Sequence, residues 1–293
     1  MRIVSYSVGD DEDYGFMVSN TEFIPRYFVE EVLGHGIPRD VRELLPDREL
    51  VELVEAAVNG VGLEKVSLDS VHVRPPIPDP RKIICLGLNY MDHVEELGAE
   101  PPDDLVIFLK PPTALTGPFD PIIKPRMVKE LDYEGEMAIV IADRCKDVEP
   151  TDAVHHIFGY MVFNDVSARD IQFKDGQWTR GKSFDTFAPA GPWITSKEEV
   201  GDPHNLRIIT RVNREVRQNS STGQMIFKVP SIVSGLSRVM TLEPGDIIAT
   251  GTPPGVGYSW RPKPRLLKPG DVVEVWIEGL GAIRNQVVEE PRA

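Results

Sequence analysis

Acidic side chains interrupt two short segments that are otherwise apolar and typical of β-strands. Glu134 and Glu136 lie in segment 131–140, and Asp165 ends segment 159–165. Residues i and i+2 of a strand share a face, so Glu134 and Glu136 project together beside a run that we expect to be buried. Repulsion and desolvation make such a pair costly unless a divalent cation lies between the carboxylates. Three carboxylates favour Mg²⁺, Mn²⁺ or Ca²⁺ over zinc. Taken alone, the pair fits a solvent-facing edge strand equally well.

Strands separated by glycine- and proline-containing turns dominate the sequence after residue 80. The expected strands are 81–88, 136–142, 160–163, 247–250 and 272–277. The last two follow Pro-Gly-Asp turns, which commonly precede a strand. Helical patterns are few, notably around His93 and over 152–157. Because strands and helices do not alternate regularly, we expect a strand-rich α+β fold and not a doubly wound sheet.

The chain is long enough for two domains, and a proline-rich segment predicts where they meet. Residues 1–72 are expected to form a small α+β domain. Its surface helix is indicated by apolar residues at helical spacing, namely Leu50, Leu53, Val54 and Ala57. Segment 73–80 contains four prolines, which exclude regular structure. Residues 73–293, which carry the three acidic side chains, then form the second domain.

Composition excludes several classes of partner. The net charge of −14 disfavours nucleic acid and anionic membrane surfaces as partners. Two cysteines give no disulfide framework, and neither has the spacing of a zinc or redox motif. The first residues resemble a strand and not a signal peptide, and no run is long enough to span a bilayer. We therefore expect a cytoplasmic location.

A histidine, a glutamate and a lysine are candidates for catalysis. His93 and Glu96 follow a predicted buried strand and lie one turn apart if the chain there is helical. A carboxylate beside an imidazole raises its basicity, as a general base acting on water requires. Lys182 lies among Trp178 and other aromatic and small residues, so its ammonium group could be partly buried and stabilise an oxyanion. A surface ion pair and a surface lysine are the corresponding structural alternatives.

Two further polar residues are candidates for substrate binding. Gln172 follows a predicted strand and could reach a substrate oxygen, whereas Arg169 and Asp170 nearby are interpreted as a structural ion pair. Thr252 lies in the Gly/Pro loop 250–257, whose backbone and hydroxyl groups could hold a carboxylate. The loop lacks the ending of a phosphate loop, and no helix follows it as in a dinucleotide fingerprint. A purely structural turn remains the alternative.

In order along the chain, these segments closely resemble the fumarylacetoacetate hydrolase family over about residues 73–284. No single motif is specific, but the ordered set is. It comprises the proline-rich run into Lys82–Tyr90, His93-x-x-Glu96, Phe108–Pro111, Glu134-x-Glu136, Asn164–Asp170, Lys182–Asp185 and Thr250–Pro253.

The resemblance implies a mixed β-sandwich roll catalytic domain, usually in a homodimer. It implies that Glu134, Glu136 and Asp165 hold Mg²⁺ or Mn²⁺. It also implies that His93 and Glu96 lie on a mobile lid segment that orders when substrate binds. By the same resemblance Lys182 lies in the active site, and Gln172 and Thr252 line it.

The substrates implied by the resemblance are 2-oxo or 1,3-diketo acids, as in aromatic catabolism. The leading hypothesis is hydrolysis of the C–C bond of an acylpyruvate or fumarylpyruvate. His93 and Glu96 would activate water, Lys182 would stabilise the oxyanion, and the metal would stabilise the expelled enolate. The alternatives are isomerisation of a 2-oxo or hydroxydiene dicarboxylate, as in the hydroxymuconate pathway, and decarboxylation of oxaloacetate. Arg126, Lys129 or Arg180 would suit a diacid. A non-catalytic metal-binding scaffold is a remote alternative.

Overall fold

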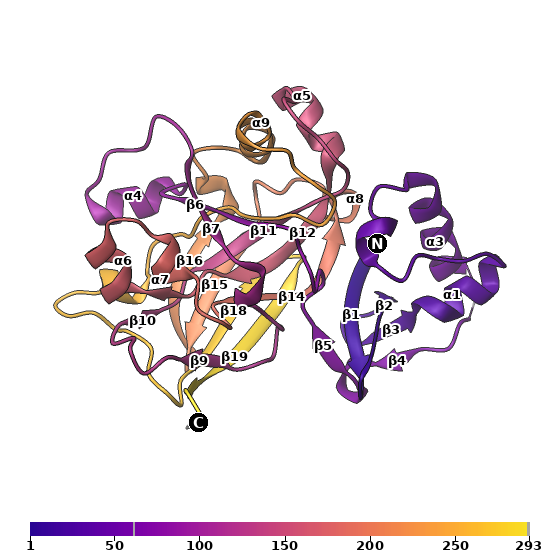
Figure 1. Cartoon of the computed structure of the whole chain (residues 1–293), viewed down its shortest axis with the longest axis horizontal. Helices are drawn as coiled ribbons and strands as arrows, with labels where there is room; N and C mark the ends of the chain where they lie inside the picture. Colours follow the sequence, from indigo (N-terminus) through magenta and orange to yellow (C-terminus); the bar gives the residue numbers. More distant parts are fainter. Residues whose placement is uncertain (61, 292–293) are drawn as a thin grey trace.

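A 12-stranded mixed sheet extends through both halves of the molecule (Figure 1). The computed structural model describes residues 1–60 and 62–291. The strands along the main path are β4 (Val66–Ser67), β3 (Glu22–Pro25), β2 (Asp11–Met17), β1 (Arg2–Val8), β14 (Ala188–Ser196), β12 (Ile157–Asn164), β11 (Gly135–Ile141), β17 (Ile247–Ala249), β6 (Ile83–Gly87) and β7 (Val106–Lys110). Off this path, β5 (His72–Arg74) pairs with β1, and β8 (Leu115–Thr116) pairs with β14.

A second, five-stranded sheet packs against strands β11, β12 and β14 of the first. Its strands, in spatial order, are β16 (Glu215–Ser221), β15 (Arg207–Val212), β18 (Val272–Ile277), β19 (Gly281–Glu289) and β9 (Ile122–Lys124). The short strands β10 (Leu131–Asp132) and β13 (Ser167–Ala168) pair beside it. The expectation of a strand-rich α+β fold is therefore confirmed.

Helices surround the strands (Figure 1). The α-helices are α1 (Arg26–Leu33), α2 (Val41–Leu44), α3 (Arg48–Gly60), α4 (Met91–Leu97), α5 (Pro150–Ala153), α6 (Arg169–Asp175), α7 (Thr179–Lys182), α8 (Lys197–Val200) and α9 (Val229–Val239). The 3₁₀ turns are η1 (Leu68–Ser70), η2 (Pro112–Ala114), η3 (Val154–His156), η4 (Thr222–Gln224) and η5 (Gly257–Ser259). Within the described residues, none of these helices is long and apolar enough to cross a bilayer.

Strand β11 is buried on both faces because its side chains alternate between two apolar cores. Met137 and Ile139 pack in the core shared with the five-stranded sheet. Ala138 and Val140 pack in the core shared with the N-terminal helices, which includes Val54. A strand buried on both faces reads as a continuous apolar run, which is why this segment was recognisable in the sequence.

Strand direction and register bring the start of β11 and the ends of β6, β12 and β17 close together in the large sheet. In the antiparallel pair β11–β12, Gly135 at the start of β11 faces Asn164 at the end of β12. Strand β17 runs antiparallel to β11, and β6 runs parallel to β17. The loops that follow β6, β12 and β17 therefore meet the start of β11.

The expected strands are confirmed with small changes in their ends, as is the helix around His93. The surface helix predicted around Leu50 is present as α3, but Leu53 on its expected apolar face is exposed. Helices α1, α6 and α9 were not predicted. Strand β1 joins the same sheet as β14, and a domain boundary near residue 72 stays a prediction.

Candidate active site

Three carboxylates converge where the start of β11 meets the end of β12. Oxygen atoms of Glu134, Glu136 and Asp165 lie within 4.8 Å of one another, and all three residues are buried. Backbone bonds fix them together: the N–H of Asp165 donates to the carbonyl of Glu134 (2.9 Å), and the N–H of Glu134 donates to Oδ1 of Asn164 (3.0 Å). A solvent-facing acidic pair is therefore the wrong alternative, since these carboxylates face one another away from bulk water.

Glu136 is the least satisfied member of this carboxylate triad. Its Oε2 accepts a hydrogen bond from the N–H of Gly251 (2.8 Å), whereas buried Oε1 has no partner among the described residues. Burial, and then the charges of Asp165 and Glu134, raise the pKa of Glu136 well above its ordinary value. An unpartnered buried oxygen among hard carboxylate donors fits a divalent cation of the Mg²⁺ or Mn²⁺ type.

Two buried lysines balance part of this negative charge. Nζ of Lys182 lies 2.7 Å from Oε2 of Glu134 and 2.6 Å from Oδ2 of Asp165. Nζ of Lys110 lies 2.5 Å from Oδ1 of Asp165 and 3.1 Å from the carbonyl of Val166. Burial alone would raise the pKa of Glu134, but the charges of Lys182 and Arg169 lower it to about 2. Lys182, expected to be partly buried, is thus fully buried against the triad.

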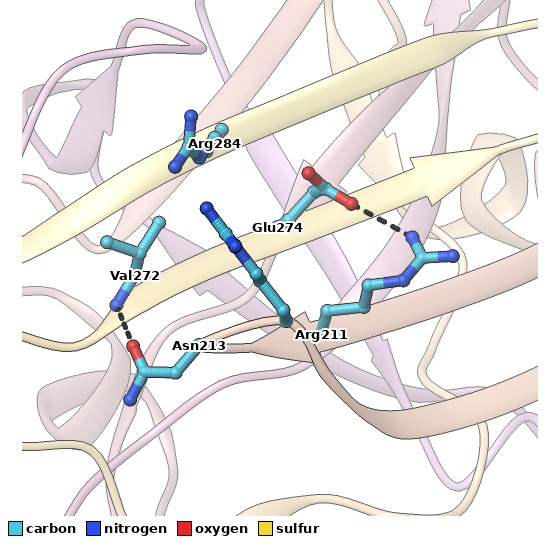
Figure 2. Close-up of a pocket in the computed structure, with 6 residues that line it drawn as sticks. Arg211, Asn213, Val272, Glu274 and Arg284 are labelled. Carbon is cyan, nitrogen blue, oxygen red and sulfur yellow. Dashed lines mark hydrogen bonds and ion pairs between the residues drawn. The ribbon is translucent and has the colours of Figure 1, made fainter.

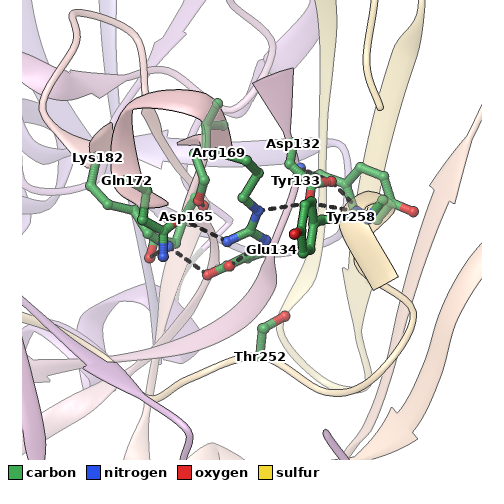
Figure 3. A network of polar contacts seen from close by, with 12 residues as sticks. Asp132, Tyr133, Glu134, Asp165, Arg169, Gln172, Lys182, Thr252 and Tyr258 are labelled. Carbon is green, nitrogen blue, oxygen red and sulfur yellow. Dashed lines mark hydrogen bonds and ion pairs between the residues drawn. The ribbon is translucent and has the colours of Figure 1, made fainter. Parts of the chain in front are cut away.

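Arg169 belongs to this site and not to a pair with Asp170. Its Nε donates to Oδ2 of buried Asp132 (2.9 Å), and its Nη2 lies 2.6 Å from Oε1 of Glu134 (Figure 3). Asp170 instead accepts backbone N–H groups from residues 129 and 130. The predicted structural ion pair is wrong because these neighbours on α6 point in different directions. Asp132 was not singled out, although it lies two residues before Glu134.

His93 and Glu96 form a hydrogen-bonded pair on α4. Nδ1 of His93 lies 3.0 Å from Oε2 of Glu96, and Oε1 of Glu96 accepts the N–H of Gly255 (3.0 Å). Since Nδ1 faces the carboxylate, Nε2 is the nitrogen left for another partner. His93 is only 8% exposed and lines a cavity, unlike a surface ion pair.

One cavity of about 170 Å³ brings most of the predicted site residues together. It is lined by His93, Glu134, Gln172, Lys182 and Thr252, together with Arg169 and several apolar side chains. Figure 3 shows the polar side of this arrangement, with Gln172 and Lys182 beside Glu134 and Asp165.

Some polar groups that line this cavity already form hydrogen bonds within the protein. Oε1 of Gln172 accepts from Nη1 of Arg169 (3.0 Å), and the hydroxyl of Thr252 donates to the carbonyl of Gly135 (2.9 Å). The basic residues suggested for diacid binding do not line the cavity: Arg180, for example, pairs with Asp175 at the surface. The cations that face the ligand space are Arg169 and Lys182.

A second hollow lies on the outer face of the five-stranded sheet, around Arg211, Asn213, Arg214, Val272, Glu274 and Arg284 (Figure 2). It holds an ion pair between Arg211 and Glu274 (2.9 Å), while Arg211 and Glu274 also face each other across β15 and β18. Because neither the triad residues nor His93 line this hollow, the candidate active site is the cavity beside Glu134.

The fold agrees with comparisons to known proteins. Residues 82–288 match the family described as "Fumarylacetoacetate (FAA) hydrolase C-terminal". The chain belongs to this family, whose members are enzymes.

Relatives in this family differ in the reaction they are named for. Over 254 residues the chain is 43% identical to a mitochondrial oxaloacetate tautomerase of Rattus norvegicus, covering 86% of this chain and 81% of the relative. A 2-hydroxyhepta-2,4-diene-1,7-dioate isomerase from Mycobacterium marinum is 36% identical, with a TM-score of 0.77 over 100% of both chains. A maleylpyruvate hydrolase from Sphingobium sp. SYK-6, in complex with manganese and pyruvate, is 33% identical, with a TM-score of 0.81 over 99% of this chain and 100% of that one.

Proposed function

We propose that the protein is a divalent-metal-dependent isomerase that interconverts the keto and enol forms of a short 2-oxo dicarboxylate such as oxaloacetate. One observation carries the proposal: His93, which is hydrogen-bonded to Glu96, lines a small cavity together with Glu134 of the carboxylate triad and two buried cations, Arg169 and Lys182. Pockets for drug-sized ligands begin at about 300 Å³. A cavity of about 170 Å³ therefore favours a small acid.

In the proposed reaction, Arg169 binds a carboxylate of the substrate. Three of its N–H groups are used by Asp132, Glu134 and Gln172. A guanidinium carries five N–H donors, so donors remain for a ligand in the cavity. Its contacts to Asp132 and Glu134 hold the planar group in one orientation, which lowers the entropy lost on binding.

In the proposed reaction, His93 transfers the proton between C3 and the oxygen on C2. With Nδ1–H donating to Glu96, Nε2 takes a proton from C3 of the keto form and delivers it to the oxygen on C2. Glu96 stabilises the imidazolium during this transfer, and its bond to Gly255 fixes the pair relative to loop 250–257. No water molecule is consumed.

The triad completes the site. A divalent cation held by Glu134, Glu136 and Asp165 would polarise the 2-oxo carbonyl and so make the C3 proton more acidic. The charge of Lys182 lowers the pKa of Glu134, and its hydrogen bonds hold Glu134 and Asp165 in their present positions. The 43% identity to an oxaloacetate tautomerase over most of both chains supports this reaction in preference to the others.

The test is to follow the decay of enol oxaloacetate by ultraviolet absorbance with purified protein and Mg²⁺. The proposal predicts acceleration above the protein-free rate, no pyruvate or carbon dioxide, and solvent deuterium at C3. Pyruvate and carbon dioxide as products would indicate a decarboxylase instead. An unchanged enol decay rate in the presence of Mg²⁺ or Mn²⁺ would refute the proposed function.

Hydrolysis of an acylpyruvate is the second candidate. It is favoured by the orientation of Glu96, which also suits a histidine that activates water, and by the related maleylpyruvate hydrolase. Incubation with acetylpyruvate or fumarylpyruvate separates the two candidates. Release of pyruvate plus the matching acid would establish hydrolysis.

A further inference from the structure

We infer that Leu97, Phe173 and Tyr258 form an apolar rim that limits the length of the ligand in the active-site cavity. All three side chains line the cavity. Phe173 is 51% exposed and Leu97 is 44% exposed, whereas Glu134, Lys182 and Thr252 of the same cavity are buried. These polar groups of the cavity are thus buried, although buried Leu86 and Phe108 also line it. Exposed Leu97 and Phe173, with half-buried Tyr258, form its solvent-facing apolar part.

Three segments that are distant in sequence bring the rim together. Leu97 ends α4, Phe173 lies on α6, and Tyr258 lies in η5. The rings of Phe173 and Tyr258 are in contact, with centroids 4.6 Å apart at 46°. Leu97 and Phe173 are exposed and line the cavity, and exposed large apolar side chains beside a cavity commonly mark a binding surface.

Asp132 holds two of these segments in register with the triad. Its carboxylate accepts hydrogen bonds from Nε of Arg169 and from the N–H groups of Gly257 (2.7 Å) and Tyr258 (3.0 Å). Arg169 lies one helical turn before Phe173, so one buried carboxylate positions both aromatic residues. A Cβ atom on Gly257 would lie 2.4 Å from Oδ1 of Asp132, which requires glycine at this contact.

The rim has a direct consequence for ligand choice. A short 2-oxo dicarboxylate fits beneath the rim, with both carboxylates near Arg169 and the triad. A 2-oxo acid with a longer tail must displace Phe173 or Tyr258, which breaks their contact. The inference depends on the proposed function only in taking a 2-oxo acid as the ligand.

The experiment measures binding of pyruvate, 2-oxopentanoate and 2-oxooctanoate to the Mg²⁺-loaded protein by calorimetry. We expect affinity to fall with tail length in the unmodified protein. In Phe173→Ala and, independently, Tyr258→Ala, the ratio of 2-oxooctanoate to pyruvate affinity rises about tenfold or more, as for a hydrophobic pocket that gains space. Phe119→Ala is the matched control, because Phe119 is 52% exposed but does not line the cavity.

Two results would refute the inference that the rim limits ligand length. One is an affinity ratio in both rim variants equal to that of the unmodified protein and of Phe119→Ala. The other is an affinity that rises with tail length in the unmodified protein, because the rim would then bind long tails and not exclude them. Either result can occur while oxaloacetate tautomerisation is intact, so the proposed function would survive it. Failure of all three acids to bind would refute the rim alone, because the proposed function concerns a dicarboxylate and is tested separately by the decay of enol oxaloacetate.

Discussion

The ionic network around Arg26 and the carboxylate triad of the active site differ in how well their charges are solvated or paired, and this difference separates a structural role from a functional one. In the N-terminal part, Arg26 pairs with Asp13 (2.8 Å) and Glu30 (2.5 Å) and donates to the carbonyl of Ile37 (3.1 Å). The Arg26 side chain is 5% exposed, but both carboxylates remain partly in water. In the active site the triad is buried, and one oxygen of Glu136 lacks a partner among the described residues.

The difference is one of solvation, because each network has one more acid than cations. The Arg26 network places one buried cation between two partly hydrated carboxylates, so water solvates the excess negative charge. In the active site four buried acids face three buried cations, namely Asp132, Glu134, Glu136 and Asp165 against Lys110, Arg169 and Lys182. Excess buried charge is costly unless a further cation binds. An ionic network that is incomplete in the protein alone therefore indicates a ligand site, whereas a complete one indicates stability.

The largest expected effect comes from Glu136→Gln, which removes the unpartnered oxygen. Metal affinity should fall by at least about a hundredfold, because even groups that only support metal ligands contribute 10–100-fold. Activity should be lost, while the metal-free protein becomes about 1 kcal/mol more stable because a buried charge is removed. Calorimetric titration with Mn²⁺ and thermal unfolding measure both quantities.

The matched control is Glu30→Gln in the Arg26 network, which should leave metal affinity unchanged. Turnover in Glu136→Gln equal to that of the unmodified protein would contradict the assignment of Glu136 as a metal ligand.

His93→Ala should lower kcat by about 10²–10⁴-fold, since it removes the proposed proton-transfer group. His93 is not one of the three candidate metal ligands, so the metal affinity of the variant should stay within a few-fold of the original. Parallel enol-decay assays and Mn²⁺ titrations would show this separation. Full activity in this variant would exclude the histidine from the mechanism.

Arg26→Met tests the other side of the comparison. It removes the buried cation of the structural network and should reduce the free energy of unfolding by about 3 kcal/mol. The Mg²⁺-induced stabilisation and kcat should not change, because Arg26 lies outside the cavity. Urea unfolding with and without Mg²⁺ gives both values. Loss of metal binding in a folded Arg26→Met protein would show that the two networks are coupled.

The smallest effect is a pH dependence of metal stabilisation. Because the pKa of Glu136 is raised in the folded protein, metal-free stability should fall as pH rises above the unfolded value of about 4.3. Mg²⁺ competes with that proton, so its stabilising effect should grow over the same range. Glu134 gives the opposite pH dependence because its pKa is lowered. The stability that it contributes is present above about pH 4.3 and is lost as pH falls towards 2. Melting curves from pH 4 to 8, with and without Mg²⁺, test this; a metal effect independent of pH would contradict it.

The strands and the triad could be predicted from sequence because each has a local signal. The apolar run of β11 shows its burial, and the i, i+2 spacing places Glu134 and Glu136 on one face. The helix of His93 and Glu96 was likewise visible in their spacing.

Other features depend on contacts between distant segments and had no local signal. Asp132 gains its role from Arg169, Gly257 and Tyr258, which lie 37 to 126 positions away. The pairing of Arg169 with Asp170 was predicted from adjacency, but tertiary partners determine where each side chain points. The exposed aromatic residues of the rim likewise gain meaning only from the cavity they surround.

The most direct test of the metal site and its ligand is a calorimetric titration of the purified protein with Mg²⁺, in the absence and presence of oxalate as a 2-oxo acid analogue. The account predicts one ion per chain, tighter binding when oxalate is present, and oxalate binding that requires the metal, as linkage demands. Saturable oxalate binding without metal, or absence of Mg²⁺ and Mn²⁺ binding, would contradict it.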